Sequence, residues 1–323
     1  MKVIKCTKYG SPVVLEIVNI EKPKPKDDEI LIKNYATTVT VADCRVRGFR
    51  VPASFRLSAR LILGFKKPKQ SILGAEFSGV IEETGKNVTK FKPGDKIFGG
   101  TGHDFGTYSE YMCLNENGRI ALKSDNLSFE QSAVLSFGGI TALHFLKKSG
   151  IKPGEKILIY GASGSIGTYA VQLAKYYGAF VTGVCSTVNL EMVKNLGADN
   201  VIDYTKTDLA DIVEKYDIFF DAVGKSNMAK SIKVIKPYGR YMQTVADPFT
   251  EIKARIKLCG TKIKFIGGTY NATVEETNYI GKLAAEGIIK PVIDKQYSFE
   301  EIAAAHEYVD TGHKKGNVVV KIC

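Results

Sequence analysis

The pattern of apolar and polar positions divides the chain into two parts that predict different kinds of secondary structure. Up to about residue 122, short apolar runs alternate with glycine or proline turns, as at Val13–Ile20, Glu29–Tyr35, Gly79–Glu83 and Lys96–Phe98. Short runs with little helical period predict strands, so we expect a mostly β, barrel-like unit there. From Ser128 onward, strand-like and helix-like segments alternate, which predicts a parallel sheet with right-handed crossovers and helices on both faces.

The alternating part continues almost to the end of the chain. Its predicted elements are Phe129–Leu135, Thr141–Lys148, Lys156–Tyr160, Thr168–Tyr176, Phe180–Val184, Leu190–Leu196, Val201–Ile202, Asp217–Phe220, Ser226–Ile235, Arg240–Thr244 and Ile263–Ile266. Two further helices, Val274–Glu286 and Phe299–Asp310, and a closing strand at Asn317–Ile322 follow, and we expect that strand to return to the β-rich unit. The pattern thus predicts domains at 1–122, 123–266 and 267–323, with the ligand site in the cleft between the nucleotide domain and the β-rich domain.

One segment carries a specific motif, because an apolar strand runs into a glycine turn and then into a helix. After Lys156–Tyr160, the small residues Ala162, Gly164 and Gly167 form the A-x-G-x-x-G variant of the dinucleotide fingerprint. Missing side chains let backbone N–H groups and the helix N-terminus meet a pyrophosphate, so we expect cofactor contacts from Ala162, Ser163, Gly164, Ser165, Ile166 and Gly167. The alternative is a tight strand-to-helix turn without a ligand.

The next predicted strand bears on the choice between NADPH and NADH. Proteins that prefer NAD usually place a carboxylate about 20 residues into such a unit, to hold the ribose 2′-hydroxyl. This chain has Cys185 and Ser186 there, which favours NADPH with the Ser186 hydroxyl donating to its 2′-phosphate. Val188 occupies the place where a basic residue is expected, and Lys206, Lys194 and Arg240 remain as candidates for the missing charge.

Composition narrows the classes of protein. The chain has 323 residues, 44% of them hydrophobic, and a formal charge of +11, but its lysines are spread among acidic residues, which argues against nucleic acid as a partner. The six cysteines include no C-x-x-C pair, as expected for a protein without a disulfide framework or a structural zinc lobe. No apolar run is long enough for an integral membrane segment, and the N-terminus reads as a strand, so we expect a cytoplasmic protein.

Several collinear stretches resemble the medium-chain dehydrogenase/reductase superfamily, in its zinc-free quinone oxidoreductase and enone reductase branch. They are Ile72–Val80, Phe91–Gly99, Gly106–Tyr111, Gly139–Leu143, Ala162–Gly167, Leu196–Asp199, Val201–Tyr204 and Gly312–Val319. The resemblance implies an α/β fold in which a GroES-like β-barrel-type domain accompanies a Rossmann domain with a doubly wound parallel sheet. It also implies an oxidoreductase that binds NADPH, or less favourably NADH.

The departures from the family pattern decide the expected chemistry. Zinc-dependent members hold their metal with Cys, His and Cys, at positions that are Thr40, Ala75 and Phe137 in this chain, and these residues do not make a zinc site. Without a Lewis acid the substrate must be activated by its own conjugation, as quinones and α,β-unsaturated carbonyls are. An enoyl-thioester reductase, or a nucleotide-binding redox sensor or structural protein with little catalysis, remain the alternatives, and a homodimer is left open.

The resemblance also suggests roles for individual side chains. Thr40 is a candidate catalytic donor to the substrate oxygen, but Thr40 with Asp43 is equally a capping pattern for a short helix through Arg47. Phe49 lies where some relatives carry a tyrosine acid, which leaves it as a wall of the substrate pocket. The remaining cofactor contacts implied by the resemblance are Thr141, Tyr204, Val223, Val245 and Asn317.

Overall fold

The computed structural model describes residues 1–51, 56–244, 248–268, 270 and 272–322. The chain forms two compact units: unit 1 comprises residues 1–137, 273–285 and 293–323, and unit 2 comprises residues 138–272 and 286–292. Helix α3 (Phe129–Ala133) packs against strands β3 and β4, which extends unit 1 beyond residue 122. The predicted domain limits at 122 and 266 mark changes in the pattern of apolar residues, whereas the compact units meet at the residues given above.

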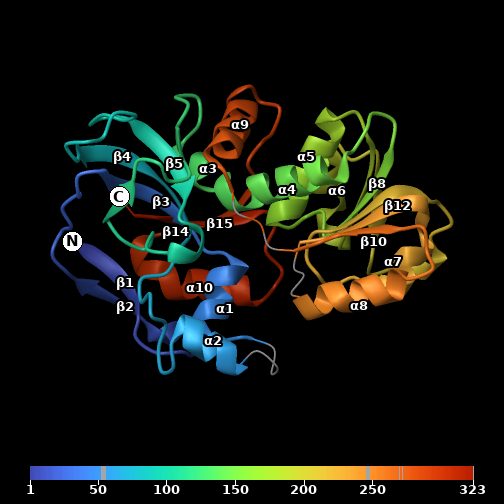
Figure 1. Ribbon diagram of the computed structural model, residues 1–323, viewed down its shortest axis with the longest axis horizontal. Helices are drawn as coiled ribbons and strands as arrows, with labels where there is room; N and C mark the ends of the chain where they lie inside the picture. Colours follow the sequence, from blue (N-terminus) through green and yellow to red (C-terminus); the bar gives the residue numbers. More distant parts are fainter. Residues whose placement is uncertain (52–55, 245–247, 269, 271, 323) are drawn as a thin grey trace. The chain divides into compact units, whose positions relative to one another are not determined.

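Unit 1 is built on a sheet of seven strands in the order β14-β15-β3-β4-β5-β7, with β6 paired to β3, and on a separate β1-β2 hairpin (Figure 1). The strands are β1 (Lys2–Cys6), β2 (Leu15–Asn19), β3 (Glu29–Thr38), β4 (Glu76–Thr84), β5 (Lys96–Gly100), β6 (Tyr111–Asn115), β7 (Ile120–Leu122), β14 (Ile293–Tyr297) and β15 (Asn317–Lys321). Besides α3, the helices are α1 (Val41–Arg47), α2 (Arg56–Leu63), α9 (Val274–Ala285) and α10 (Ile302–Asp310), with 3-10 turns η1 (Pro12–Val14), η3 (Gly102–Asp104) and η6 (Phe299–Glu301).

The closing strand returns to unit 1, as predicted. β15 runs antiparallel to the end of β3, where Val319 lies opposite Thr38, while the start of β3 pairs with β6 instead. The interior between these strands is apolar, and one cluster contains Ile30, Phe77 and Ile97, each with almost no exposed surface. Burying such side chains gives roughly 1.5–3 kcal/mol each and holds the sheet together.

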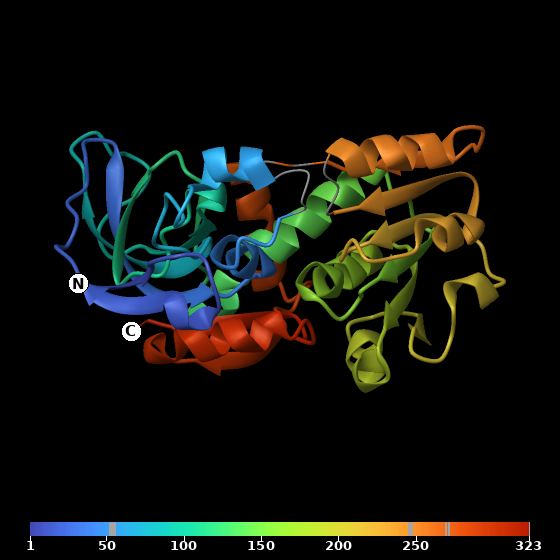
Figure 2. The same cartoon turned by 90° about the horizontal axis from the view of Figure 1, so that it is seen from below.

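Unit 2 has a six-stranded parallel sheet in the order β10-β9-β8-β11-β12-β13, which confirms the predicted doubly wound arrangement. The strands are β8 (Lys156–Tyr160), β9 (Phe180–Cys185), β10 (Asn200–Asp203), β11 (Tyr216–Asp221), β12 (Ile235–Gln243) and β13 (Lys264–Ile266). The helices are α4 (Ser136–Ser149), which enters from unit 1, α5 (Ser165–Tyr176), α6 (Leu190–Asn195), α7 (Met228–Lys233) and α8 (Pro248–Leu258), with short turns η4 (Thr187–Asn189) and η5 (Leu209–Asp211). Helices lie on both sides of the strands (Figure 2).

Some elements differ from the prediction. β12 begins at Ile235 rather than Arg240, because Ile235 already pairs with Tyr216 of β11, and α7 therefore ends at Lys233. Helices α2 and α8 were not predicted. Within the described residues, no helix is long and apolar enough to span a bilayer.

Candidate functional site

The glycine turn of unit 2 connects β8 to α5 through Gly161–Gly164. Gly161 has a φ of +80°, a conformation that favours glycine, and its N–H and that of Ala162 both donate to the Val184 carbonyl at 3.0 Å. Gly164 is the N-cap of α5, and no side chain caps the helix there. No side chain therefore covers the N-terminus of α5, the place where the fingerprint predicts an anion.

Gly164 and Gly167 serve different purposes in this turn. A Cβ on Gly167 would lie 2.1 Å from the Gly161 carbonyl oxygen and 2.7 Å from Ala162 Cα, so only glycine allows the helix to pack this closely. A Cβ on Gly164 would have no neighbour nearer than the Gly161 oxygen at 3.5 Å. Gly164 therefore leaves open space over the turn, and that space fits the pyrophosphate of a dinucleotide.

Val223 lies beside the glycine turn, where the strand order reverses between β8 and β11. A Cβ on Gly161 would come within 2.6 Å of Val223 Cγ1. The loop that carries Val223 is organised by buried Asp221, whose carboxylate accepts from the N–H groups of Val223, Gly224 and Ser226. Ligands of doubly wound sheets bind at this switch point, next to the carboxyl ends of the strands.

Ser186 is linked to the glycine turn by a residue that sequence reasoning missed. The Asn189 amide Nδ2 donates to Ser163 Oγ at 3.2 Å and to Ser186 Oγ at 3.1 Å. Asn189 is buried, and its Oδ1 has no hydrogen-bond partner among the described residues. An orphaned acceptor beside two predicted cofactor residues suits a ribose hydroxyl, since buried polar atoms normally find a partner.

Tyr204 follows β10 and lies next to the end of β9, because its N–H donates to the Cys185 carbonyl at 3.1 Å. Its ring is half exposed, so it is accessible to a ligand. Lys206 lies two residues further, with Nζ 3.9 Å from the Asp203 carboxylate. The Arg240 guanidinium instead binds Glu155 and the Ser149 carbonyl, which removes it as a source of charge for the cofactor.

The other predicted contacts are scattered over the chain. Thr141 lies half-buried in α4 of unit 2, while Asn317 is buried at the start of β15 in unit 1. Val245 lies outside the described residues. The turn, Ser186, Tyr204 and Val223 are brought together within unit 2, and the roles of all these residues stay predictions.

Thr40 in unit 1 is the N-cap of α1 and forms a capping box with Asp43. The Thr40 hydroxyl donates to Asp43 Oδ2 at 2.6 Å and accepts from the Asp43 N–H, while Asp43 Oδ1 accepts from the Gly74 N–H. Burial raises the pKa of Asp43 against these hydrogen bonds. The single proton of the Thr40 hydroxyl is therefore already committed, and the structure shows the capping alternative.

Two of the three positions that hold zinc in zinc-dependent members of the family that this chain resembles, Ala75 and Phe137, adjoin a buried carboxylate that sequence reasoning also missed. Ala75 precedes Glu76, whose carboxylate accepts from the Thr38 hydroxyl at 2.6 Å and from the Phe137 N–H. Burial raises the pKa of Glu76 to about 7, although both hydrogen bonds and Lys314 oppose this. A methyl group, a phenyl ring and a capped hydroxyl do not fit zinc, and within the described residues no group of three or more His, Cys, Asp or Glu could hold a metal.

Phe49 lies at the other end of α1 from Thr40, with a positive φ of +48°. Its ring is 4.8 Å from that of Tyr9 and 3.8 Å from the Arg60 guanidinium, centroid distances typical of packed aromatic and cation–π contacts. These residues line a cavity of about 350 Å³. Phe49 is thus the wall of a small cavity in unit 1.

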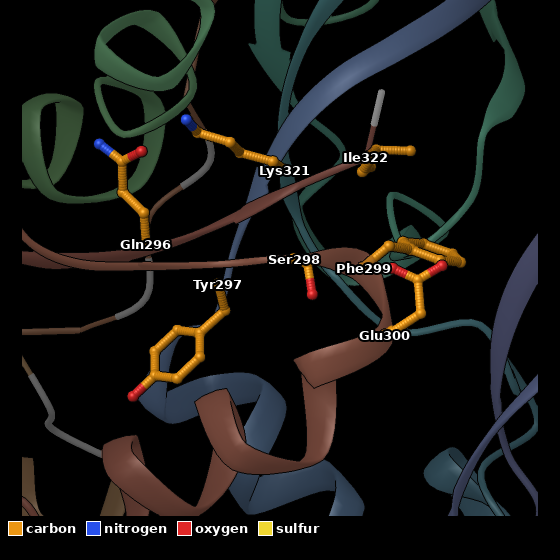
Figure 3. A pocket seen from close by; sticks show the side chains of 7 residues that line it. All are labelled: Gln296, Tyr297, Ser298, Phe299, Glu300, Lys321 and Ile322. Atoms are coloured by element: carbon orange, nitrogen blue, oxygen red, sulfur yellow. The ribbon is translucent and has the colours of Figure 1, made fainter.

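A second cavity of unit 1, about 420 Å³, lies at the ends of β14 and β15 (Figure 3). Gln296 and Tyr297 point to opposite sides of β14, and Lys321 and Glu300 contribute one charge of each sign. Its lining includes none of the residues that we predict to bind cofactor or substrate. We assign no function to it.

His306 is buried in α10 and connects two distant parts of unit 1. Its Nε2 lies 3.0 Å from the Tyr108 hydroxyl and its Nδ1 3.4 Å from Cys44 Sγ. Burial lowers the pKa of His306 to about 3 and raises that of the Cys44 thiol, so both groups are neutral at ordinary pH. Arg47 pairs with Asp310 in the same region. A neutral, buried His–Cys pair holds α1 against α10 and is not a nucleophilic centre.

Comparison with known proteins gives matches along nearly the whole chain. Residues 26–124 match the family "Alcohol dehydrogenase GroES-like domain", which supports the predicted GroES-like fold of unit 1, and residues 196–320 match "Zinc-binding dehydrogenase". The chain is 31% identical to 2-methylene-furan-3-one reductase of Solanum lycopersicum, over 99% of this chain and 79% of that protein. It is also 31% identical to the chloroplastic NADPH-dependent alkenal/one oxidoreductase of Arabidopsis thaliana, with the same coverage.

A solved structure agrees with these sequence matches. The quinone oxidoreductase from Coxiella burnetii superimposes with a TM-score of 0.89 at 31% identity, covering 100% of this chain and 99% of the other.

Proposed function

Because the chain belongs to the quinone oxidoreductase branch of the medium-chain dehydrogenase/reductase superfamily, we propose that it reduces quinones or α,β-unsaturated carbonyls with NADPH and without a metal. The observation that carries this proposal is the pairing of an open glycine turn in unit 2 with a donor set in unit 1 that does not fit zinc.

The cofactor is held by the residues around the glycine turn. Backbone N–H groups at the start of α5 bind the pyrophosphate over Gly164, and Ser163 with Ser186 faces the adenosine ribose. Ser186 donates to the 2′-phosphate, Lys206 supplies the positive charge that Val188 lacks, and Tyr204 covers the site from β10. Thr141, Val223, Val245 and Asn317 complete the predicted contacts. When bound, NADPH supplies a hydride.

The substrate side of the proposal follows from what unit 1 lacks. An unactivated carbonyl needs a Lewis acid to polarise it, whereas a quinone or enone accepts a hydride by virtue of its conjugation. Thr40 can accept a further hydrogen bond through its second lone pair, but it donates to a substrate oxygen only by releasing Asp43. Phe49 presents an apolar face with no proton to give. The final proton therefore comes from solvent.

The direct test is oxidation of NADPH by purified full-length protein with a panel of quinones, alkenals and enoyl-CoA thioesters. We expect turnover with quinones or alkenals, unchanged by a strong chelator and without stoichiometric zinc by elemental analysis. Turnover confined to enoyl-CoA favours a thioester reductase, and tight NADPH binding without turnover of any substrate favours a sensor. About one zinc per chain that tracks with activity would overturn the metal-free proposal.

We also propose that the protein acts in the cytoplasm, unlike its chloroplastic relative described above. Fluorescence microscopy of the tagged full-length protein in its own cells decides this, and localisation to an organelle would contradict it.

A further inference from the structure

One stretch of unit 1 contains basic residues and no acidic ones. Residues 44–75 contain eight basic residues and no acidic residue, and the net charge of the whole chain is +11. Asp43 and Glu76, which flank this stretch, are both buried. Arg47 is buried, and both Arg47 and Arg50 pair with Asp310. The remaining positive charge therefore lies at Arg45, in α2 and in the loop that follows α2.

Helix α2 has its apolar side chains on the wrong side for an ordinary surface helix. Its inward side is formed by Ala59, which is 9% exposed, and by Arg60, whose guanidinium stacks on the Phe49 ring. Leu57, Leu61 and Ile62 are 74%, 58% and 71% exposed, respectively. A surface helix normally turns such residues toward the core and polar residues toward water.

The loop after α2 adds to this surface. Phe65 is 62% exposed, and Lys66, Lys67 and Lys69 follow it on the surface. The Lys69 ammonium donates to the Leu61 carbonyl at 2.7 Å, which holds a cation directly beside the exposed leucine and isoleucine. Exposed large apolar side chains of this density mark an interaction site, and α2 lies at the periphery of unit 1 in both views (Figures 1 and 2).

We propose that α2 and residues 64–69 form a peripheral docking surface for a bilayer of anionic lipids. The exposed aliphatic side chains enter the boundary between head groups and acyl chains, while the lysines meet the lipid phosphates. The surface has the mixture of protruding apolar groups and adjacent ammonium groups that a lipid interface accommodates, and its uniform positive charge complements anionic head groups. This inference is independent of the proposed function.

Co-sedimentation of the full-length protein with vesicles tests the proposal. We expect binding to phosphatidylcholine vesicles that contain about 30% phosphatidylglycerol, little binding to phosphatidylcholine alone, and weakening by added salt. A wild-type protein that stays in the supernatant with anionic vesicles overturns the proposal, and so does equal binding to both vesicle types.

Variants locate the surface on the chain. The double substitution Leu61→Gln/Ile62→Gln should lower the partition coefficient at least tenfold, and Lys66→Gln/Lys67→Gln about tenfold. The matched controls are Val213→Gln, at a residue that is 89% exposed in unit 2, and Lys8→Gln/Lys24→Gln, at two exposed lysines of unit 1. Unchanged binding by the α2 variants, or equal loss in the controls, overturns the assignment. If the wild-type protein is a dimer that does not bind vesicles, and Leu61→Gln/Ile62→Gln dissociates that dimer, then a second copy of the chain covers this surface. That result overturns the lipid proposal.

Tryptophan fluorescence tests directly whether α2 enters the bilayer, without a variant that loses binding. The chain contains no tryptophan, so Leu57→Trp introduces a single tryptophan, which can be excited selectively, on the exposed side of α2. Its emission should shift to shorter wavelength with anionic vesicles and stay unchanged with neutral ones, because indole enters the interface. Emission that stays at its solvent-exposed wavelength with anionic vesicles contradicts insertion of α2.

Discussion

In unit 2 the candidate site is an open space over a glycine turn, whereas in unit 1 the buried side chains at the candidate site are paired with one another. No side chain caps α5 at Gly164, and the space over the turn is open there. Thr40 with Asp43 and Thr38 with Glu76 instead satisfy each other. The difference indicates that unit 2 is prepared for a charged ligand, and that unit 1 supplies a wall for a substrate that already carries its own reactivity.

The largest effect should come from filling the open space in unit 2. Gly164→Val should lower NADPH affinity about a thousandfold while the protein stays folded, because the added side chain blocks charge-assisted hydrogen bonds worth roughly 1.5–3 kcal/mol each. Room for a Cβ exists there, with no neighbour nearer than 3.5 Å. Nucleotide fluorescence titration measures the affinity, and circular dichroism checks the fold.

The control for this experiment is Gly167→Val, three residues further along. Its Cβ would lie 2.1 Å from the Gly161 carbonyl oxygen, so we expect a loss of thermal stability in addition to lost binding. The same melting temperature for both variants would contradict the distinction between an open and a packed glycine.

The next effect concerns the paired interior of unit 1 and its dependence on pH. The pKa of Glu76 is raised from 4.5 to about 7, so the folded protein keeps a proton that the unfolded chain loses between these values. Binding of this proton contributes about 3 kcal/mol to the free energy of unfolding. The contribution is fully present below pH 4.5 and is lost as pH rises through 7. Glu76→Gln should remove this loss, as measured by urea unfolding at both ends of the window.

The two proteins are compared at each pH, so that other titrating groups cancel. His306, with its pKa lowered to about 3, contributes in the opposite direction and is present in both. Parallel stability curves for wild type and Glu76→Gln would show that Glu76 does not titrate in this range.

A smaller effect tests which cofactor the unit 2 site prefers. Ser186→Asp should reverse the preference from NADPH to NADH, by about tenfold in each affinity, because a carboxylate repels the 2′-phosphate and accepts from a free 2′-hydroxyl. Asn189 already donates to Ser186, and it can donate to the new carboxylate in the same way. Titration with both cofactors measures the change, and an unaltered ratio would remove Ser186 from the site.

The smallest effect should come from Thr40→Val, which deletes a capping hydroxyl without leaving a cavity. Loss of the cap should cost about 1 kcal/mol of stability, and because the hydroxyl proton is committed to Asp43, turnover per folded molecule should change little. The melting temperature and the rate at saturating substrate separate the two effects. A 10–100-fold slower rate at unchanged stability would restore Thr40 as a catalytic donor.

Features of the fold that depend on residues close together in the sequence were predictable. β8 matches its predicted limits because an apolar run ends at a glycine turn, and the order of the glycines gives the dinucleotide fold. Local patterns also gave the capping box as one of two alternatives for Thr40, and the structure contains it. Helix α2 was missed although its apolar and polar side chains lie on separate sides, and local sequence gave no sign that the apolar side, with Leu57, Leu61 and Ile62, is the exposed one.

The buried polar pairs could not be predicted because they join residues far apart in the chain. Cys44 and His306 are separated by 262 positions, and Glu76 meets Phe137 across 61. The one local sign of Glu76 was a glutamate between Ala75 and Phe77, at the first residue of β4. Asn189 looked like an ordinary loop residue, and only the fold shows that its amide joins Ser163 to Ser186.

The return of β15 to β3 also determines the order in which the protein can be completed during translation. The end of β3 emerges from the ribosome with its partner, residues 317–321, still unmade. Every residue of unit 2, up to 292, is synthesised before that partner. Unit 2 can therefore form all its hydrogen bonds before unit 1 can. The nascent unit 1 keeps an unpaired strand edge until synthesis ends. A chaperone has most to protect during that interval.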